Sequence, residues 1–561
     1  MGRKEIFEPQ TKPMARPPFS ALAAFEERKI PLAFVSAIIV ALSIFIPKTF
    51  PLAWFGLVPF LAAINSNSLR SSLAVSFVFG FIFHGAANYW LVPTIADLGP
   101  YTQSPSQSMV FWALIAFVLL LLWQSLFFAL FGLVAQVILQ RSRGFASAIG
   151  IGAAWLLTEW LRSIGTFGYP WALLASTQVA FLPIAQWASL TGSFGLSGLI
   201  AFVNSLFFEW LRWNDKRFFI AAFASLVLLS LLGWAEMVRL NSISQKSQHL
   251  TVALIQGNFG KERWRPDVTF KELDEILQVH LSLSEQAAKR GARLIVWSET
   301  ALPWRLREDD LWGYGANEIQ EIANKMKVAL FVGAGDWRGG KSYNACFLFA
   351  PEKMLLGNNV YHKIRLVPFG EYIPGRELFP WLGKILPRAP VETAKGNLWE
   401  MPTLIFSDAK LRIKVATAIC FESLFPFHLR KLVSNLPSQT SNANLVAIIT
   451  NDSWFGDTLA PYHHARVAIL RAIELRRSIV RCAGTGVSAI VSPAGEILQS
   501  AGWNQRRVLI ASVPIINIRS AYLILGDLPF VVFSFLALAL IFSCFGRLRL
   551  KSEEISEVKT G

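Results

Sequence analysis

Charged residues are scarce in this sequence. Asp, Glu, Lys and Arg together make up 16% of its 561 residues, whereas soluble globular domains usually contain about 25%. Hydrophobic residues make up 53%. This balance excludes an ordinary soluble protein and predicts a membrane protein. The length leaves room for a bundle of membrane spans and a separate domain of about 250–300 residues.

Cysteine is also rare, and its spacing excludes further classes of protein. The four cysteines are Cys346, Cys420, Cys482 and Cys544. None belongs to a C-x-x-C pair, so we expect neither a zinc or thiol-redox site nor a disulfide framework. His463 and His464 are adjacent, a spacing that cannot direct both rings from a helix face to one metal ion. We therefore expect no metal and no other cofactor.

Acidic residues are outnumbered by basic ones, 37 against 53, which gives a formal net charge of +16. A nucleic-acid-binding protein would gather such charge on a soluble face. Here many basic residues flank apolar runs instead. That placement favours orientation in a bilayer and contact with anionic head groups over binding of nucleic acid.

Eight apolar runs predict a multi-span α-helical membrane bundle of about eight transmembrane helices. Most runs reach the roughly 17–25 residues that a span requires, and 51–66 is marginal. The runs are 30–47, 51–66, 72–93, 109–140, 146–162, 183–210, 218–236 and 528–546. They divide the chain into a tail at 1–29, a seven-helix region at 30–236, a domain at 237–527, a last helix at 528–546 and a tail at 547–561.

Loop charges predict how the bundle is oriented. Lys and Arg are concentrated in 1–29, in alternate loops after it, and after the last span, whereas 94–108 contains none. The positive-inside rule therefore places both termini in the cytoplasm and 237–527 on the opposite side. About thirty mixed polar residues precede the first run, and no cleavage motif follows it, so we expect an uncleaved anchor.

The segment 237–527 has the pattern of an α/β domain. Short apolar runs typical of buried strands alternate with helical patterns at 268–290, 315–327 and 461–477. The strand runs lie at 251–256, 293–297, 329–334, 345–349, 413–419 and 445–450. Later stretches at 478–491 and 506–514, with the turn signal Ser492-Pro493-Ala494-Gly495 between them, predict a hairpin.

Three polar residues follow strand runs, where α/β folds place reacting groups. Glu299 ends RLIVWSE, Lys363 follows NNVYH, and Cys420 ends IKVATAIC. A carboxylate can activate a thiol as a nucleophile, and a nearby lysine can hold an oxyanion and lower the thiol pKa. Each residue alone has a simpler interpretation, since a lone cysteine is usually a small buried hydrophobe.

Longer motifs around these residues favour the catalytic interpretation. WSETALP (297–303), YHKIRLVPFGEYIP (361–374), ICFES (419–423) and NDSWFG (451–456) resemble the Glu-Lys-Cys site of the nitrilase superfamily in the same chain order. With spans before and after the domain, the whole chain resembles the apolipoprotein N-acyltransferase family. The resemblance implies that the α/β domain is an αββα sandwich on the periplasmic side of a bacterial inner membrane.

The resemblance also implies an activity. An acyl chain from the sn-1 position of a phospholipid would form a thioester on Cys420. It would then pass to the α-amino group of the S-diacylglyceryl cysteine at an apolipoprotein N-terminus. Glu299 would act as the general base, and Lys363, helped by backbone N–H groups near Phe421, would stabilise the oxyanion. The scheme requires no cofactor and no more than a monomer.

Supporting roles are implied for residues in the same motifs. Glu371 corresponds to a second family glutamate that positions Lys363, and Glu422 to the acidic residue after the nucleophile. Some members have a hydroxylated aromatic residue where this chain has Phe421, so that side-chain hydrogen bond is absent here. Trp264 corresponds to a tryptophan at the acyl entrance. Pairing of Glu422 with an arginine and simple packing of Trp264 remain alternatives.

An apolar segment at 374–387 follows the Lys363 motif and contains Phe379, Trp381, Leu382, Ile385 and Leu386. Such a segment can enter a lipid interface and admit a two-chain substrate, with Trp381 and Leu382 in contact with it. Packing on the domain itself is the alternative.

Two other functions stay open on the sequence alone. A membrane-anchored amidase would use the same thioester on a small amide, but one span would suffice to tether it. An inactive binding module is disfavoured because Glu299, Lys363 and Cys420 are all present.

Overall fold

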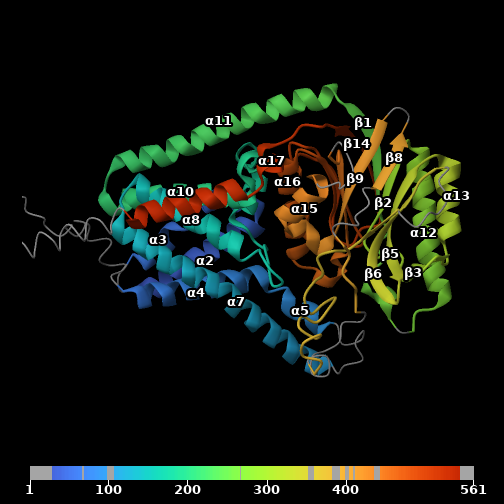
Figure 1. Ribbon diagram of the computed structural model, residues 1–561, viewed down its shortest axis with the longest axis horizontal. Coiled ribbons are helices and arrows are strands. Elements are labelled where there is room, and N and C mark those ends of the chain that lie inside the picture. Colours follow the sequence, from blue (N-terminus) through green and yellow to red (C-terminus); the bar gives the residue numbers. More distant parts are fainter. Residues whose placement is uncertain are drawn as a thin grey trace, which may run out of the picture.

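The computed structural model describes residues 28–65, 68–97, 106–265, 267–351, 359–381, 392–397, 404–408, 411–434 and 442–543. A bundle of long helices forms one part of the molecule, and an α/β domain lies against one end of it (Figure 1). The order of these parts along the chain agrees with the predicted fold class.

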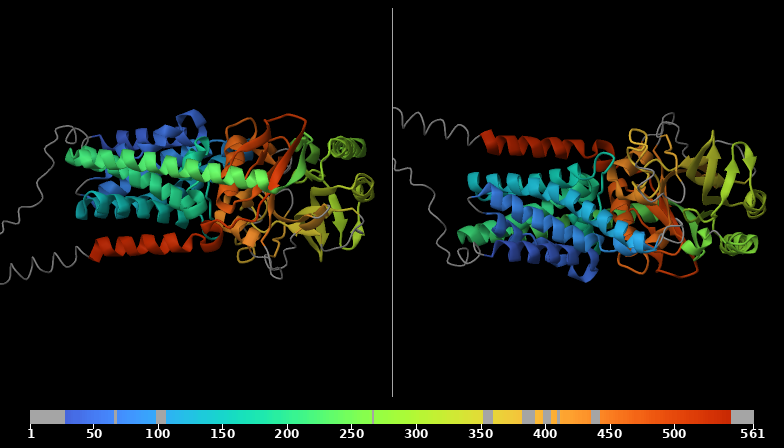
Figure 2. Two further views of the ribbon diagram at one scale, coloured as in Figure 1. Left: turned by 90° about the horizontal axis from the view of Figure 1, so that it is seen from above. Right: turned by 90° about the horizontal axis from the view of Figure 1, so that it is seen from below.

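Apolar helices lie within the predicted runs. Among the described residues, five helices are long and apolar enough to cross a membrane, and three shorter apolar helices are Lys29–Phe45, Phe145–Leu161 and Leu528–Ser543. The bundle consists of α2 (Lys29–Phe45), η1 (Pro47–Trp54), α3 (Val58–Ile64), α4 (Leu69–Asn88), α7 (Ser106–Arg141), α8 (Phe145–Leu161), α10 (Ala188–Trp213) and α11 (Lys216–Lys246). The helix Leu528–Ser543, red in Figure 2, runs along one side of the bundle.

The second predicted span is interrupted. It consists of the 3-10 helix η1, which contains Pro51, and the short helix α3. A break inside a bilayer leaves backbone groups without partners unless side chains supply them. Asn204 on α10 does so, because its Nδ2 donates to Ala53 O at 2.8 Å and its Oδ1 accepts from Leu57 N at 2.9 Å.

The helix α11 moves the boundary between bundle and domain. It was expected to end at 236 but continues to Lys246, and β1 (Gln248–Gln256) follows almost at once. Its 31 residues correspond to about 46 Å at 1.5 Å per residue, well beyond a hydrocarbon thickness of about 30 Å. The helix therefore projects from the bundle and reaches the domain, as Figure 1 shows.

The domain contains two stacked sheets. One has eight strands: β14 (Arg507–Ile515), β1, β2 (Leu294–Trp297), β5 (Ala329–Arg338), β3 (Arg305–Glu308) and β4 (Leu311–Trp312) in that order, with β6 (Lys341–Phe349) on β5 and β7 (Val360–His362) on β6. The other has six in the order β13 (Ile497–Ala501), β12 (Ser488–Val491), β11 (Ser478–Ala483), β10 (Leu445–Thr450), β9 (Leu411–Ile419) and β8 (Leu404–Asp408). Strands β1 and β2 pack against β10 and β11 across the layers.

Helices cover the outer faces of the two sheets. The first sheet is covered by α12 (Phe270–Lys289) and α13 (Ala316–Met326). The second is covered by α15 (Pro426–Ser434) and α16 (Ala460–Leu475). The layers are thus helix, sheet, sheet and helix, which confirms the predicted αββα sandwich.

The predicted hairpin at 478–491 and 506–514 is wrong in its second strand. The turn at Ser492–Gly495 does join antiparallel strands, but these are β12 and β13. The strand β14 crosses to the other sheet and pairs antiparallel with β1. Alternating apolar residues predict a strand but not its sheet, because both sheets bury one face in the same interior.

Polar contacts attach the domain to the bundle. Glu474 on α16 accepts from Ser193 N at 2.7 Å and Ser193 Oγ at 2.6 Å, where α10 is kinked. Arg466 on the same helix donates to Phe45 O at the end of α2 at 2.9 Å. The helix α16 therefore packs on the second sheet with one side and on the bundle with the other.

A close crossing of α8 and α10 gives a prediction about stability. A Cβ added at Gly152 would lie 2.8 Å from Gly198 O, whereas one at Gly85 would meet only the Leu121 side chain at 3.7 Å. We expect Gly152→Ala to lower the melting temperature in detergent through overpacking that costs about 1–3 kcal/mol. Gly85→Ala is the control, and equal melting temperatures for the two variants would contradict the close crossing.

Candidate active site

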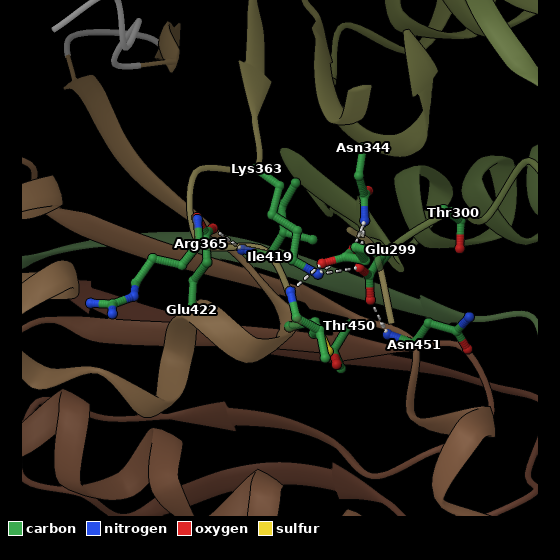
Figure 3. Close-up of polar contacts among 12 residues, drawn as sticks. Glu299, Thr300, Asn344, Lys363, Arg365, Ile419, Glu422, Thr450 and Asn451 are labelled. Atoms are coloured by element: carbon green, nitrogen blue, oxygen red, sulfur yellow. Dashed lines mark hydrogen bonds and ion pairs between the residues drawn. The ribbon is translucent and has the colours of Figure 1, made fainter. Parts of the chain in front are cut away.

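Three strand ends bring the predicted catalytic residues together. Glu299 lies two residues after β2, Lys363 directly follows β7, and Cys420 directly follows β9. The side chains of Glu299 and Lys363 are almost completely buried, with 5% and 1% of each residue exposed. Figure 3 shows Lys363 and Glu299 directed toward one another, with Thr450 and Asn451 beside them.

Lys363 is held between two carboxylates. Its Nζ donates to Glu299 Oε1 at 3.1 Å and to Glu371 Oε1 at 2.9 Å. Burial opposes the ammonium charge, but Glu299 and Glu371 outweigh it and raise the pKa of Lys363 well above its ordinary value. Lys363 is therefore a fixed positive charge, suited to an oxyanion and not to proton transfer.

Two asparagines fix the orientation of Glu299. Asn344 on β6 donates through Nδ2 to Glu299 Oε1 at 2.7 Å and to Glu371 Oε1 at 3.3 Å. The backbone N–H of Asn451 donates to Glu299 Oε2 at 2.7 Å. Asn451 belongs to the motif NDSWFG, but no role was predicted for it. Asn344 was not predicted as a site residue, because it lies inside a strand and its contacts with Glu299 and Glu371 depend on the fold.

Cys420 lies at a sharp turn between β9 and the 3-10 helix η5 (Cys420–Leu424). Its φ of 51° is in the left-handed region, which non-glycine residues rarely adopt and which often marks a functional position. The turn places the thiol beyond the end of the strand, next to the charges of Glu299 and Lys363.

The thiol is not activated in advance. Burial and the negative charge of Glu299 raise the pKa of Cys420 far above its ordinary value, and the opposing effect of Lys363 is too small to reverse this. Lys363 does lower the thiol pKa, as expected, but burial and Glu299 have the larger effect. Cys420 is therefore a neutral thiol at neutral pH, and nucleophilic attack requires a base that removes its proton.

Glu422 connects the turn at Cys420 to the loop of Lys363. Its Oε1 accepts from Ile364 N at 2.7 Å and Arg365 N at 2.9 Å. Its Oε2 accepts from Ile419 N at 2.8 Å and from the Tyr361 hydroxyl at 2.7 Å. Backbone donors and Tyr361 thus replace the arginine side chain that was the alternative partner, and Glu422 joins two of the three catalytic segments.

The other predicted supporting residues surround this centre. Glu371 Oε2 accepts from Val367 N at 2.8 Å, which closes the loop after Lys363 on itself. Phe421 packs edge-on against Phe425, with ring centroids 5.0 Å apart. Trp264 stacks on Trp454 at 5.2 Å, so it packs against the loop that follows β10.

The apolar segment after Lys363 is only partly described. Trp381 is 54% exposed and Phe379 52%, and their rings meet edge-on with centroids 6.3 Å apart. The described part therefore does not pack into the domain core. Leu382 lies outside the described residues.

The described residues contain no group of three or more histidine, cysteine or acidic side chains that could hold a metal ion. His463 has neither ring nitrogen hydrogen-bonded within the described part of the chain, and its ring packs on Trp171 at 4.7 Å and Phe45 at 4.9 Å. His464 faces Ser423 and Arg481 instead.

Fold and site together define a domain of the carbon-nitrogen hydrolase class, and residues 251–522 match the model of that family, Carbon-nitrogen hydrolase. Residues 36–206 match the Apolipoprotein N-acyltransferase N-terminal domain. A relative from Geobacter metallireducens named Apolipoprotein N-acyltransferase is 30% identical over 90% of this chain and 93% of its own. This chain belongs to the apolipoprotein N-acyltransferase family.

A further relative agrees with this membership. A second relative with the same name, from Gloeobacter violaceus, is 29% identical over 85% of this chain and 86% of its own. Among solved structures, a carbon-nitrogen hydrolase superfamily protein from Xanthomonas campestris aligns with a TM-score of 0.35 and 18% identity over 50% of this chain and 95% of its own.

The contacts of Glu422 give a prediction that depends on pH. Burial alone would raise its pKa, but His428, whose Nε2 lies 3.2 Å from Glu422 Oε1, and the backbone donors outweigh burial and lower the pKa. The pKa of Glu422 is thus lower in the folded protein than in the unfolded chain, where it is about 4.3. The ionised carboxylate therefore stabilises the fold above that pH, and this stabilisation is lost as the pH falls through the pKa of the folded protein.

We therefore expect Glu422→Gln to reduce stability at pH 7 by about 1–3 kcal/mol, because an amide –NH₂ would face donors. The difference in melting temperature between wild type and variant should shrink as pH falls below about 4. Substitution of the exposed Glu321 by Gln is the control. A difference that does not change with pH would contradict the assigned charge state.

Proposed function

We propose that this protein transfers a fatty acyl chain from a membrane phospholipid to the N-terminus of an apolipoprotein. The acyl donor is the sn-1 ester, and the acceptor is the α-amino group of the S-diacylglyceryl cysteine. Family membership supports the reaction class. The donor, the acceptor and the roles of individual residues are inferred from the site and from its position beside the bundle.

One observation favours a lipid substrate over a small soluble amide: the Lys363 loop contacts a loop of the bundle. Arg365 Nη2 donates to Gly165 O at 3.0 Å, between α8 and α10. Phe369 stacks on Phe167 with ring centroids 6.3 Å apart, and both side chains are about half exposed. A soluble substrate has no need for apolar side chains that continue from the bundle to the catalytic loop.

The charges of the site support a two-step mechanism. In the first step, Glu299 removes the Cys420 thiol proton as sulfur attacks the ester carbonyl, and Lys363 holds the oxyanion. The ester C–O bond then breaks, the lysophospholipid alkoxide takes the proton from Glu299, and a thioester remains on Cys420. In the second step, Glu299 removes a proton from the attacking amine, the C–S bond breaks, and the thiolate is reprotonated as the amide forms.

Orientation and assembly complete the proposal. The protein is a multi-pass protein of the bacterial inner membrane. The distribution of Lys and Arg supports a position of the catalytic domain on the periplasmic side. The site is assembled from one chain, so a monomer suffices.

The thioester is directly testable. We expect purified protein incubated with phospholipid to gain a fatty-acyl mass on the Cys420 peptide, and hydroxylamine to remove it. Cys420→Ala should gain none, whereas Cys482→Ala, which changes a buried cysteine on β11, should load normally. Absence of the adduct from wild type, or its presence on Cys420→Ala, would contradict the mechanism.

The two glutamates around Lys363 should differ in their effects. Glu299→Ala removes the base and should lower the rate of acyl loading by a factor of about 100–10,000. Glu371→Ala leaves Lys363 with one carboxylate and should lower it by about 10–100. Single-turnover loading followed by mass spectrometry measures both, and wild-type loading by the Glu299 variant would refute the assignment of the base.

A further inference from the structure

The hydroxyl of Ser423 stabilises the strained turn at Cys420. Ser423 Oγ donates to the backbone carbonyl of Cys420 at 2.7 Å. A left-handed conformation costs a non-glycine residue roughly 1–2 kcal/mol, so it persists only where surrounding contacts fix it. Ser423 is 1% exposed, and its hydroxyl hydrogen is directed to the backbone of the turn.

Ser423 is in turn oriented by His464. The Nε2 of His464 lies 3.1 Å from Ser423 Oγ. The one hydroxyl hydrogen of Ser423 is already directed to Cys420 O, so the hydrogen of this second bond belongs to His464 Nε2. His464 lies on α16, the helix that also packs on the bundle.

Arg481 and Asp452 lie on the other side of the His464 ring. With the ring hydrogen on Nε2, Nδ1 is an acceptor, and Arg481 Nη2 donates to it at 3.0 Å and to Asp452 Oδ2 at 2.9 Å. Asp452 Oδ1 lies 3.0 Å from the same Nδ1, and both Asp452 and Arg481 are fully buried. Burial would raise the pKa of Asp452, but the charge of Arg481 opposes it and the pKa is lowered.

The same carboxylate leads back to the thiol. Thr450 Oγ1 donates to Asp452 Oδ1 at 3.0 Å. Thr450 ends β10, and the register that pairs Ile449 with Ile419 on β9 sets it beside Cys420, where its side chain lowers the pKa of the thiol. The contacts therefore form a ring around Cys420 that starts at its carbonyl, passes through Ser423, His464, Arg481 and Asp452, and ends at Thr450 beside the thiol.

We propose that Ser423, His464, Asp452 and Thr450 are positioning residues that hold both ends of Cys420, its carbonyl and its thiol, against the Glu299–Lys363 pair. The inference rests on the proposed role of Cys420 as the nucleophile. These residues do not touch the substrate. They keep the sulfur where Glu299 can take its proton and keep the strained turn from relaxing to an ordinary strand end.

Substitutions that keep or remove one hydroxyl test the ring. Thr450→Val removes the hydroxyl at nearly constant volume, and Thr450→Ser restores it. Ser423→Ala and Ser423→Thr form a second such pair. We expect each hydroxyl-free variant to lower kcat of acyl transfer about tenfold with KM unchanged, since one hydrogen bond is lost near the reacting atom. The hydroxyl-bearing variants should remain within about threefold of wild type.

The two histidines provide a matched control on one helix. His464→Met removes the ring that orients Ser423 and should lower kcat about tenfold. His463→Met changes a neighbouring histidine that is equally buried and has no hydrogen bond on its ring within the described residues, and kcat should be unchanged. Melting temperatures of all variants separate positioning from loss of the fold.

Alkylation distinguishes failure of the ring from failure of the proposed function. The rate at which iodoacetamide modifies the Cys420 peptide, measured by mass spectrometry, reports the thiol without any lipid. If the ring of contacts positions the thiol, Cys420 is alkylated more slowly in Thr450→Val than in Thr450→Ser. Equal rates within each hydroxyl pair, or equal losses in His463→Met and His464→Met, would overturn the positioning role. Wild type that alkylates as expected but accepts no acyl chain would overturn the proposed function alone.

Discussion

The buried ammonium of Lys363 between the carboxylates of Glu299 and Glu371 is the interaction on which the site depends. Buried charges are tolerated only when they are paired and hydrogen-bonded, and here Asn344, the Asn451 N–H and the Val367 N–H complete the cluster. One ammonium between two carboxylates leaves the cluster net negative. That charge, with burial, raises the pKa of the Cys420 thiol, so nucleophilic attack requires a base that removes its proton.

The placement of this cluster follows from how the domain joins the bundle. The projecting helix α11 leads directly into β1, and α16 contacts both the second sheet and α10. The Lys363 loop meets the loop after α8 through Arg365 and Phe369. A single tethering helix could not impose these contacts. The bundle therefore positions the catalytic loop beside apolar surface, which is what a reaction between a phospholipid and a lipid-modified N-terminus requires.

Much of this architecture could be predicted from the sequence, because it depends on local patterns. Apolar runs identified the helices, and strand ends with the motifs around them marked Glu299, Lys363 and Cys420 as candidate site residues. The rest depends on contacts between distant segments. Asn344 lies within a strand, and His464 was considered from the sequence only as a metal ligand together with His463. The break at η1 is tolerated because Asn204, far along the chain, supplies its hydrogen bonds. The choice of sheet by β14 likewise follows from pairing with β1 and not from its own residues.

The most direct measurement follows the acyl group from enzyme to amine. Wild-type protein loaded with an isotope-labelled acyl chain is freed of phospholipid and divided, and a diacylglyceryl peptide with a free α-amine is added to one half. The account predicts that the label leaves Cys420 rapidly only in that half and appears there in an amide. Release of labelled fatty acid at the same rate in both halves would contradict it, because the thioester would then belong to a hydrolase.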